Sequence, residues 1–434
     1  MKSNRKLVTS LLAPALLLFP GLVLAQDGLN GANTSWILTS TALVLFMTLP
    51  GLSLFYAGLV RTKNVLSVLM QCFSIAVVIS IVWLLVGYSI AFGPSESAWW
   101  GGLGKAFFSG VDAGAMSGDI PETVFAAFQM TFAIITPALI VGAFVERIKF
   151  SSMLAFTVLW ALLVYFPVAN WVWGGGWLGQ MGLIDFAGGT VVHLTAGVAA
   201  LVLALELGRR DGFLTSSVVP HNLTMSFTGA AMLWVGWFGF NAGSALAADN
   251  AAGMALYVTH TSAAAGALTW MVLDWFKFGK ASGLGAITGM VAGLATITPA
   301  AGSVGPMGGL LLGLIGGVIC YFVTIYMKQR LKVDDSLDVF PVHGIGGLTG
   351  TLLAAVLVSG GLGVFSGTGM PDGMTVGSQF MVQLIGVFAI GVYTGVLTWV
   401  IVKIVSMVMG LRVSADEEQV GLDITEHDEK GYSM

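Results

Sequence analysis

Long apolar segments recur along this chain of 434 residues, and they limit its possible folds more than any other feature. A helix needs about 20 apolar residues to cross the hydrocarbon core of a bilayer. Only 9% of the residues are charged and the mean hydropathy is +0.89, which is far more apolar than a soluble fold requires. We therefore predict an all-α polytopic membrane protein with about eleven transmembrane helices, over residues 35–60, 64–92, 122–145, 150–169, 188–207, 220–244, 252–275, 282–298, 304–327, 340–359 and 376–409.

The beginning of the chain has the pattern of a targeting segment. Basic residues precede an apolar run over 7–24, and this run leads into a small-residue pattern that is typical of a cleavage site. Because two prolines interrupt the run, we expect a cleaved signal peptide over 1–25 rather than a first transmembrane helix. This division leaves a membrane domain over 26–409 and a cytoplasmic tail over 410–434.

Basic residues also indicate how the chain is oriented. Only Lys105 lies in a loop that follows an even-numbered span. Because Lys and Arg are enriched in cytoplasmic loops, we predict that the mature N-terminus lies outside and the C-terminus in the cytoplasm. The basic residues after odd-numbered spans are Arg61, Lys63, Arg147, Lys149, Arg209, Arg210, Lys277, Lys280, Lys328, Arg330, Lys332, Arg412 and Lys430, and Lys403 lies at the end of span 11.

One motif occurs twice, once in each half of the chain. Asp185 precedes His193 by eight residues, and Asp335 precedes His343 by eight; in both copies a Val stands before the His and a Gly follows four residues after it. Spans 5 and 10 would run in opposite directions, so spans 1–5 and 6–10 read as inverted copies, with the long eleventh helix outside the repeat. Each His lies roughly 12 Å along a helix from its Asp, so the two rings can meet near the middle of the membrane.

The polar residues of this motif have more than one reading. Histidines inside a bilayer are costly unless hydrogen-bonded, and two at matched positions favour a pore function over simple packing against backbone carbonyls. Asp185 can cap its helix or attract a cation, and we favour the cap. Asp335 lies beside basic residues, so a surface ion pair is the alternative to a supporting role. Zinc needs three or four ligands, and we expect neither a metal nor another cofactor here.

Aromatic residues gather toward the predicted outer face. Phe128 and Phe132 share a helix face, as do Phe240 and Ser244, because each pair is separated by four residues. Aromatic rings and a hydroxyl can hold a small cation. Phenylalanines at helical spacing also occur as ordinary core residues, and tryptophans such as Trp173 as a membrane-interface belt, so these residues alone leave the site open.

Several longer motifs follow one another along the chain. They are Phe128-Gln-Met-Thr-Phe132, Trp171-Val-Trp173-Gly-Gly-Gly, the segments 185–197 and 333–344, Gly236-Trp-Phe-Gly-Phe240-Asn-Ala-Gly-Ser244 and Gly410-Leu-Arg412. In this order they resemble the bacterial ammonium transporter family, and the resemblance covers about residues 30–430. One departure is Pro341, two residues before the second His, where a Gly is usual.

The resemblance implies a role for each of these residues, in a protein that is not an enzyme. It implies an outer recruitment site for ammonium, a stacked gate, a pair of histidines lining an apolar pore, and structural roles for Asp185 and Asp335. It also implies a homotrimer in the bacterial inner membrane, a cytoplasmic PII signalling protein as a partner of the tail, and no nucleic acid. The recruitment residues would be Phe128, Trp173 and Ser244, the gate Phe132 and Phe240, and the pore pair His193 and His343.

Physical chemistry suggests how such a pore selects its substrate. An apolar lumen cannot hold a bare cation cheaply, but ammonium can leave its proton behind and continue as neutral ammonia, with the proton relayed by the histidines. Methylammonium is a further candidate substrate. The alternatives are a passive channel for neutral ammonia and an ammonium sensor that acts through a PII partner. A membrane enzyme is disfavoured, because no nucleophile motif or ligand set accompanies the histidines.

Overall fold

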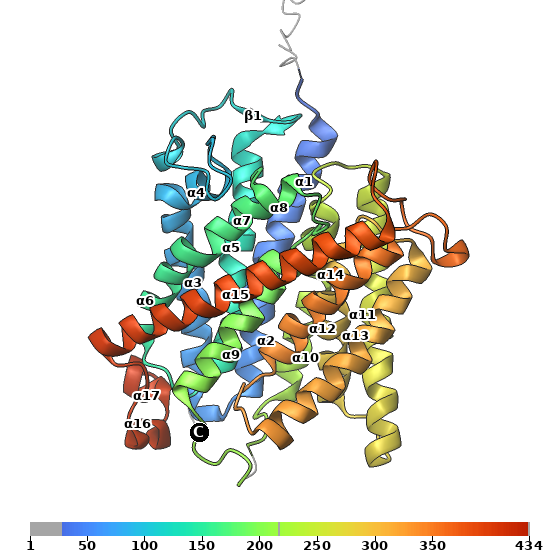
Figure 1. Cartoon of the computed structure of the whole chain (residues 1–434). Helices are drawn as coiled ribbons and strands as arrows, with labels where there is room; N and C mark the ends of the chain where they lie inside the picture. Colours follow the sequence, from blue (N-terminus) through green and yellow to red (C-terminus); the bar gives the residue numbers. More distant parts are fainter. Residues whose placement is uncertain (1–27, 216–217, 433–434) are drawn as a thin grey trace, which may run out of the picture.

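The structure, a computed structural model, describes residues 28–215 and 218–432 and shows a bundle of long helices (Figure 1). The predicted signal peptide over 1–25 lies outside the described residues. Ten helical stretches within the described ranges are long and apolar enough to cross a membrane, which confirms the predicted class of fold. They are Gly31–Leu59, Thr62–Phe92, Glu122–Phe144, Phe150–Gln180, Gly189–Leu207, Leu223–Gly243, Gly283–Ala300, Pro306–Leu331, Phe340–Leu357 and Val376–Met409.

The remaining predicted span, 252–275, is also a helix but a less apolar one. It forms α11 (Asn250–Phe278), which begins where the Asp249 carboxylate accepts a hydrogen bond from the Ala252 N–H at 3.0 Å. α11 packs against α12 and α13. Several of its polar side chains find partners inside the bundle, such as Ser262, whose hydroxyl donates to the Gly293 carbonyl at 2.8 Å. Burial of these groups explains why a helix of this composition still belongs to the bundle.

The α-helices are joined end to end in several spans by short π-helical or 3₁₀ segments. π-Helical turns inside membrane helices often mark functional places. The α-helices are α1 (Gly31–Phe46), α2 (Ser53–Leu59), α3 (Val65–Val82), α4 (Tyr88–Phe92), α5 (Glu122–Phe144), α6 (Phe150–Trp160), α7 (Phe166–Val172), α8 (Trp177–Gln180), α9 (Thr195–Leu207), α10 (Leu223–Gly243), α12 (Gly283–Ile297), α13 (Pro306–Tyr326), α14 (Ile345–Leu357), α15 (Val376–Met409), α16 (Ala415–Val420) and α17 (Leu422–His427). The π-helical segments are η1 (Met47–Leu52), η3 (Trp83–Gly87), η5 (Ala161–Tyr165), η6 (Gly189–Leu194), η8 (Met327–Leu331) and η9 (Phe340–Gly344), and the 3₁₀ segments are η2 (Thr62–Asn64), η4 (Ala106–Phe108), η7 (Thr298–Ala300) and η10 (Gly363–Phe365).

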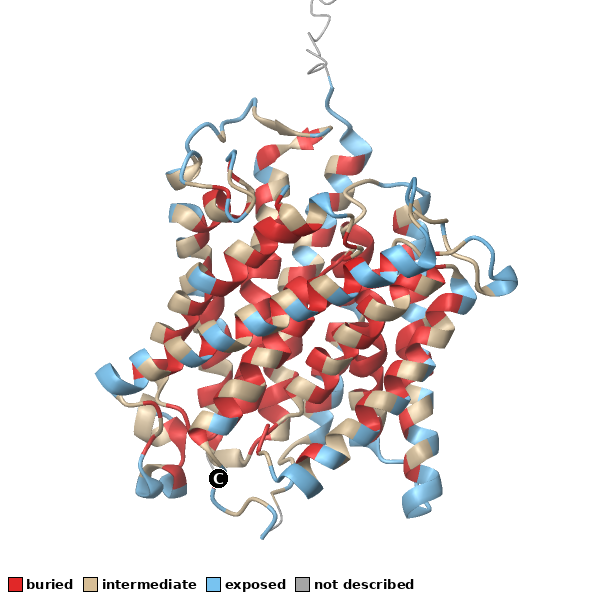
Figure 2. Cartoon of the chain, viewed as in Figure 1, coloured by how far each residue is buried: buried red, intermediate tan, exposed pale blue. Residues whose placement is uncertain are grey.

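The two ends of the bundle differ. At one end, the long loop after α4 carries a small antiparallel hairpin, in which β1 (Met116–Ser117) pairs with β2 (Ile120–Pro121). At the other end lie α16 and α17, which make up the tail, while α15 crosses the outside of the bundle obliquely (Figure 1). Buried residues concentrate in the interior and exposed ones on the outer faces and loops (Figure 2). Large apolar side chains such as Phe388 and Met407 on α15 are exposed, as expected of helices that face lipid.

The two copies of the repeated motif cross each other at close range. A side chain on Gly197 would come within 2.3 Å of the Gly344 Cα atom, and one on Gly347 within 2.4 Å of the Gly189 carbonyl oxygen. Moving forward along the first copy, from 189 to 197, therefore means moving backward along the second, from 347 to 344. The copies are antiparallel, as expected of an inverted repeat, and only glycine allows their backbones to approach so closely.

We predict that Gly197→Ala destabilises the protein, because the added methyl group would overlap the backbone of the second copy. Overpacking of this kind typically costs about 1–3 kcal/mol or more. Thermal unfolding of the purified protein in detergent micelles would measure the loss as a lower apparent melting temperature. Gly391→Ala is the matched control, because no atom of the described residues lies within 4 Å of a side chain added at that glycine of α15; equal melting temperatures of the two variants would contradict the close crossing.

Candidate functional site

A hollow opens at the end of the bundle away from the tail, and we name it the outer hollow. Two of the predicted recruitment residues line it, each just beyond the end of a helix. Trp173 follows α7 and donates its ring N–H to the Asp185 carbonyl at 2.9 Å, while Ser244 follows α10 and donates its hydroxyl to the Phe240 carbonyl at 2.8 Å. The lining consists of Phe92, Phe125, Gln129, Val172, Trp173, Phe186, Ser244 and Leu246.

The third predicted recruitment residue, Phe128, lies behind this surface. Its side chain is 1% exposed, and its ring meets the Phe132 ring edge-on at 5.0 Å between centroids. Phe125, one turn earlier on α5, lines the hollow instead. The sequence predicted the spacing of the aromatic residues on this helix. It did not predict the rotation of the helix about its axis, which determines which ring faces the hollow.

The predicted gate residues meet directly beneath the outer hollow. The Phe132 and Phe240 rings are stacked at 4.3 Å between centroids with 25° between their planes, and both are buried. Phe132 also contacts the Trp173 ring edge-on at 5.8 Å. Two stacked rings without polar atoms separate the outer hollow from the interior.

The two repeated histidines form a pair on the inner side of the gate. Nδ1 of His193 lies 3.2 Å from Nδ1 of His343, and the rings are stacked at 5.2 Å between centroids. A hydrogen bond between two Nδ1 atoms requires one of them to carry a proton and the other to accept it. The pair is therefore asymmetric: on one ring Nε2 is a donor, and on the other it is an acceptor.

Trp237 is a further residue of this pair that the sequence analysis did not single out. Its ring stacks on His193 at 5.4 Å between centroids, and its N–H donates to the Thr298 hydroxyl at 3.0 Å. It stands three residues before Phe240 on α10, so both rings project from one face toward the histidines. This spacing is the signal that could have identified it.

Asp185 holds the start of the helix that carries His193, as predicted. Its carboxylate accepts hydrogen bonds from the N–H groups of Gly188, Gly189, Thr190 and Val191 and from the Thr190 hydroxyl. Burial raises the pKa of this carboxyl, and the bonds from the Thr190, Val191 and Gly189 donors oppose the rise. Asp185 thus supplies the acceptors that a buried helix start needs.

Asp335 takes the corresponding place before His343, and it is not a surface ion pair. It is 2% exposed, and its Oδ2 accepts from the Phe340 N–H at 2.7 Å. Asp338 is the residue that pairs with the basic cluster, through Lys328 at 2.7 Å. The alternative reading of Asp335 as a surface ion-pair residue is therefore wrong, because the backbone folds its side chain inward onto the helix start.

A second hollow, the inner hollow, reaches His343 from the tail end of the bundle. Its lining is more polar than the gate region and includes both members of the Lys328–Asp338 pair. The outer hollow, the gate, the histidine pair and the inner hollow therefore follow one another through the protein. The residues that line the inner hollow are Phe55, Tyr56, Leu59, Arg210, Val218, Pro220, Leu284, Thr288, Val291, Lys328, Ser336, Leu337, Asp338, Val342 and His343.

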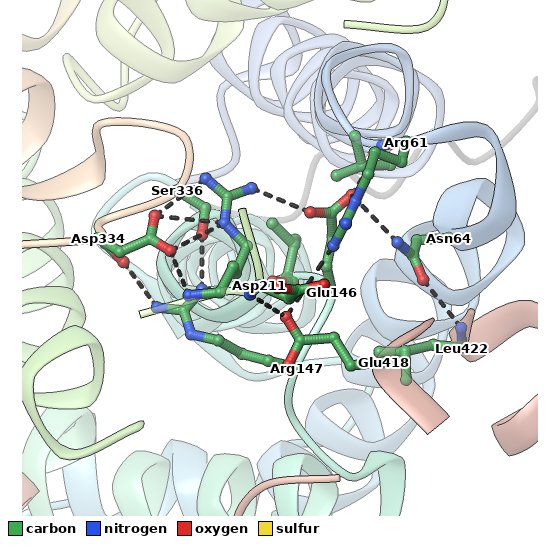
Figure 3. Close-up of polar contacts among 12 residues, drawn as sticks. Arg61, Asn64, Glu146, Arg147, Asp211, Asp334, Ser336, Glu418 and Leu422 are labelled. Carbon is green, nitrogen blue, oxygen red and sulfur yellow. Dashed lines mark hydrogen bonds and ion pairs between the residues drawn. The ribbon is translucent and has the colours of Figure 1, made fainter. Parts of the chain in front are cut away.

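A network of buried charges closes the tail end of the bundle (Figure 3). Arg210 pairs with Glu146 at 3.1 Å and with Asp334 at 2.9 Å, and Arg61 pairs with Glu146 at 3.1 Å. Burial alone would raise the pKa of Glu146, but the guanidinium groups of Arg210 and Arg61 hold it below its usual value. Charges this deep are stable only because each has a partner.

The tail joins this network through Glu418. Its carboxylate accepts from the Asp211 N–H at 2.7 Å and from the Arg412 guanidinium at 2.7 Å, and the nearby Leu422 N–H donates to the Asn64 side chain at 2.8 Å. The sequence analysis placed residues 410–434 at a partner interface and did not foresee that the tail folds back on the chain's own loops.

Asp423 of the tail caps a membrane helix. Its carboxylate accepts from the Leu66 N–H at 3.1 Å and the Ser67 N–H at 2.8 Å, at the start of α3. Asn64, which precedes α3, makes no such side-chain bond to it. The cap of the second membrane span therefore comes from a residue more than 350 positions later.

Sequence comparison places these features in a known context. The sequence model of the ammonium transporter family matches residues 35–432. The ammonium transporter of Bacillus subtilis is 47% identical over 399 residues, covering 90% of this chain and 96% of that protein. The ammonium transporter Amt1 of Archaeoglobus fulgidus is 43% identical, covering 93% and 100% respectively.

Solved structures show the same fold. A sensor Amt protein superimposes with a TM-score of 0.85 at 28% identity, covering 91% of this chain and 98% of the other. Mep2 of Saccharomyces cerevisiae superimposes with a TM-score of 0.83 at 35% identity, covering 90% and 89%.

We predict that Arg210→Met destabilises the tail end of the bundle, because it leaves Glu146 and Asp334 buried without their shared partner. Removing one member of a buried charge network costs about 3–5 kcal/mol. The measurement is the apparent melting temperature, together with the rate at which a protease removes the tail.

The neighbouring Arg209→Met is the matched control, since Arg209 is exposed and, among the described residues, donates to the Lys332 carbonyl alone; we expect a change within about 0.5 kcal/mol. Because the partners lower the pKa of Glu146 and of Asp334, the wild-type network contributes its stability at neutral pH. That contribution is lost as the pH falls through the lowered pKa values. An Arg210→Met protein that melts with the wild type would contradict this account.

Proposed function

The chain belongs to the ammonium transporter family, and we propose that it takes up ammonium by binding the cation in the outer hollow and conducting ammonia past the histidine pair. One observation carries the proposal: the stacked Phe132 and Phe240 rings and the His193–His343 pair lie one after the other in space, between the outer and the inner hollow. Relatives that share the fold are transport proteins rather than enzymes.

Recruitment would depend on aromatic faces and a hydroxyl. Trp173 presents its ring to the outer hollow, and the lone pairs of the Ser244 oxygen can accept an N–H of ammonium while its own proton bonds the Phe240 carbonyl. Phe128 would contribute from the second layer by fixing the position of Phe132.

The gate would act by forcing the cation to lose its water and its proton. A potassium ion has no proton to leave behind, so the apolar rings and the narrow path beyond them present it with an uncompensated desolvation cost. Ammonia is neutral and can donate to, or accept from, the free Nε2 atoms of the histidine pair. His193 Nε2 is buried and has no partner among the described residues, so it can take this role.

The histidine pair would also relay the released proton, which makes uptake electrogenic. The shared Nδ1···Nδ1 bond allows a proton to arrive on one ring as another leaves from the other. A passive channel for neutral ammonia is the second candidate. A third candidate, an ammonium sensor acting through a PII partner, is suggested by the sensor Amt protein among the structural neighbours.

We predict that ammonium jumps on liposomes containing the purified protein produce a transient current on a solid-supported membrane, and that potassium jumps produce none. In His193→Ala the ammonium current should fall at least about tenfold, because general acid–base steps contribute 10²–10⁴-fold. An intact internal pH change without current would support the passive ammonia channel. Equal currents with potassium would contradict the proposed selectivity.

Trp173→Leu separates recruitment from conduction in the same experiment. Loss of a cation–π contact of about 0.5–2 kcal/mol should raise the half-saturating ammonium concentration about 2- to 30-fold and leave the maximal current unchanged. Trp100→Leu, at an exposed position, serves as the matched control.

We further propose a homotrimer with its tail in the cytoplasm of a bacterial cell. His260, in the middle of α11, is exposed. Among the described aromatic residues, its ring contacts only Trp234 and Phe238 of α10. A polar ring facing lipid is costly, so a second copy would cover it. The basic loops and the tail share one end of the bundle, which the positive-inside rule assigns to the cytoplasm, where a PII protein would bind.

Native mass spectrometry of the protein in detergent should show three copies, and three copies plus a trimeric PII protein after mixing. A chain ending at Met409 should keep the trimer if α11 forms the interface, but lose the PII complex. Monomers of the full chain at micromolar concentration would contradict the assembly.

A further inference from the structure

The two aspartates that cap the histidine-bearing helices are not equally satisfied. Asp185 receives five hydrogen bonds, which use both of its oxygens. Asp335 receives a bond from Phe340 N–H on Oδ2, with the Val339 N–H contributing to the same cap. Its Oδ1 is buried and has no hydrogen-bond partner among the described residues. In the first copy of the motif both carboxylate oxygens of Asp185 accept hydrogen bonds, whereas in the second copy Oδ1 of Asp335 accepts none from the described residues.

Two substitutions between the copies explain the difference. Six residues after Asp185 stands Val191, whose N–H donates to the carboxylate at 3.1 Å; six residues after Asp335 stands Pro341, which has no N–H. Five residues after Asp185, the Thr190 hydroxyl donates as well. The corresponding residue in the second copy is Phe340, which has no polar side-chain atom.

The surroundings do not replace the missing donors. Lys328 of η8 faces Asp335 but donates to Asp338, and Asp338 itself adds negative charge. Arg147, between α5 and α6, donates to uncharged acceptors such as Ser336 and to the Asp334 carbonyl. From α2, the Tyr56 hydroxyl donates to the Leu139 carbonyl. Burial, followed by the charge of Asp338, raises the pKa of Asp335 to about 7.

We propose that Asp335 is a positioning residue for His343 that exchanges a proton with the inner hollow, because Pro341 leaves one of its oxygens without a donor. The proposal rests on the pore function proposed above. Ser336 and Asp338, close to Asp335 in sequence, line the inner hollow, so water there is the source and the acceptor of the proton.

Protonation would weaken the cap and so loosen the hold on His343. An ionised carboxylate makes stronger bonds to backbone N–H groups than a neutral carboxyl. Because the pKa of Asp335 is raised to about 7, its carboxyl is protonated below this pH and ionised above it. The firm cap therefore exists only at the higher pH. Transport should therefore decline as the pH on the inner side falls through this range.

Infrared difference spectroscopy of the full-length protein in lipid tests the proton-binding step directly. In the wild type, the carbonyl band of a protonated carboxyl should disappear as the pH rises through about 7, and Asp335→Asn should remove this band. Pro341→Val restores the N–H found at the matching position of the first copy, and should move the midpoint at least about one unit toward acid. A band that Asp335→Asn leaves unchanged, or an unmoved midpoint in Pro341→Val, would overturn the proposal.

Ammonium currents across the same pH range test the positioning step. We expect the wild-type ammonium current to fall, as the pH is lowered, around the midpoint pH of the infrared band. The Pro341→Val current should persist to lower pH. Identical pH profiles for the two proteins would overturn the positioning role of Asp335. Absence of ammonium current at every pH would instead overturn the proposed function, while the infrared band would still decide whether Asp335 binds the proton. Size-exclusion profiles of Asp335→Asn and Pro341→Val that match the wild type would exclude misfolding as the cause of a changed band or current.

Discussion

Helix starts buried inside a membrane protein impose the constraint on which this structure depends. The first N–H groups of a helix have no partner within it, and no water in the hydrocarbon region can replace one. The chain meets this need with a carboxylate folded back onto each of the two central helices, from Asp185 and from Asp335. Because the helices can then begin within the bundle, the histidines in their first turns can meet at its centre.

Close packing determines how near the two helices come. The glycines that follow each histidine allow antiparallel backbones to touch, so that Nδ1 of His193 and Nδ1 of His343 lie within hydrogen-bonding distance. Aromatic side chains fill the space on the outer side. The centre of the bundle thus holds a small polar pair within apolar walls, which suits the solute proposed above, because ammonium can exist both as a cation and as a neutral molecule.

The sequence predicted the parts of this arrangement that depend on period and spacing. Apolar length identified the helices, and the repeated Asp-to-His interval identified the pair. It could not predict that Phe125 rather than Phe128 lines the outer hollow, because helix rotation depends on packing between helices. Nor could it predict the partners of Glu418 or the inward position of Asp335, because these contacts join residues that local patterns do not relate.

The cap that Asp423 provides for α3 bears on how the protein is made. A chain leaves the ribosome from its N-terminus, so the second membrane span is inserted long before its capping residue exists. Its first turn must remain without this cap until Asp423 is synthesised. This end of the fold can therefore be completed only after Asp423 has been made, and a product that terminates before Asp423 would leave the first turn of α3 without its cap.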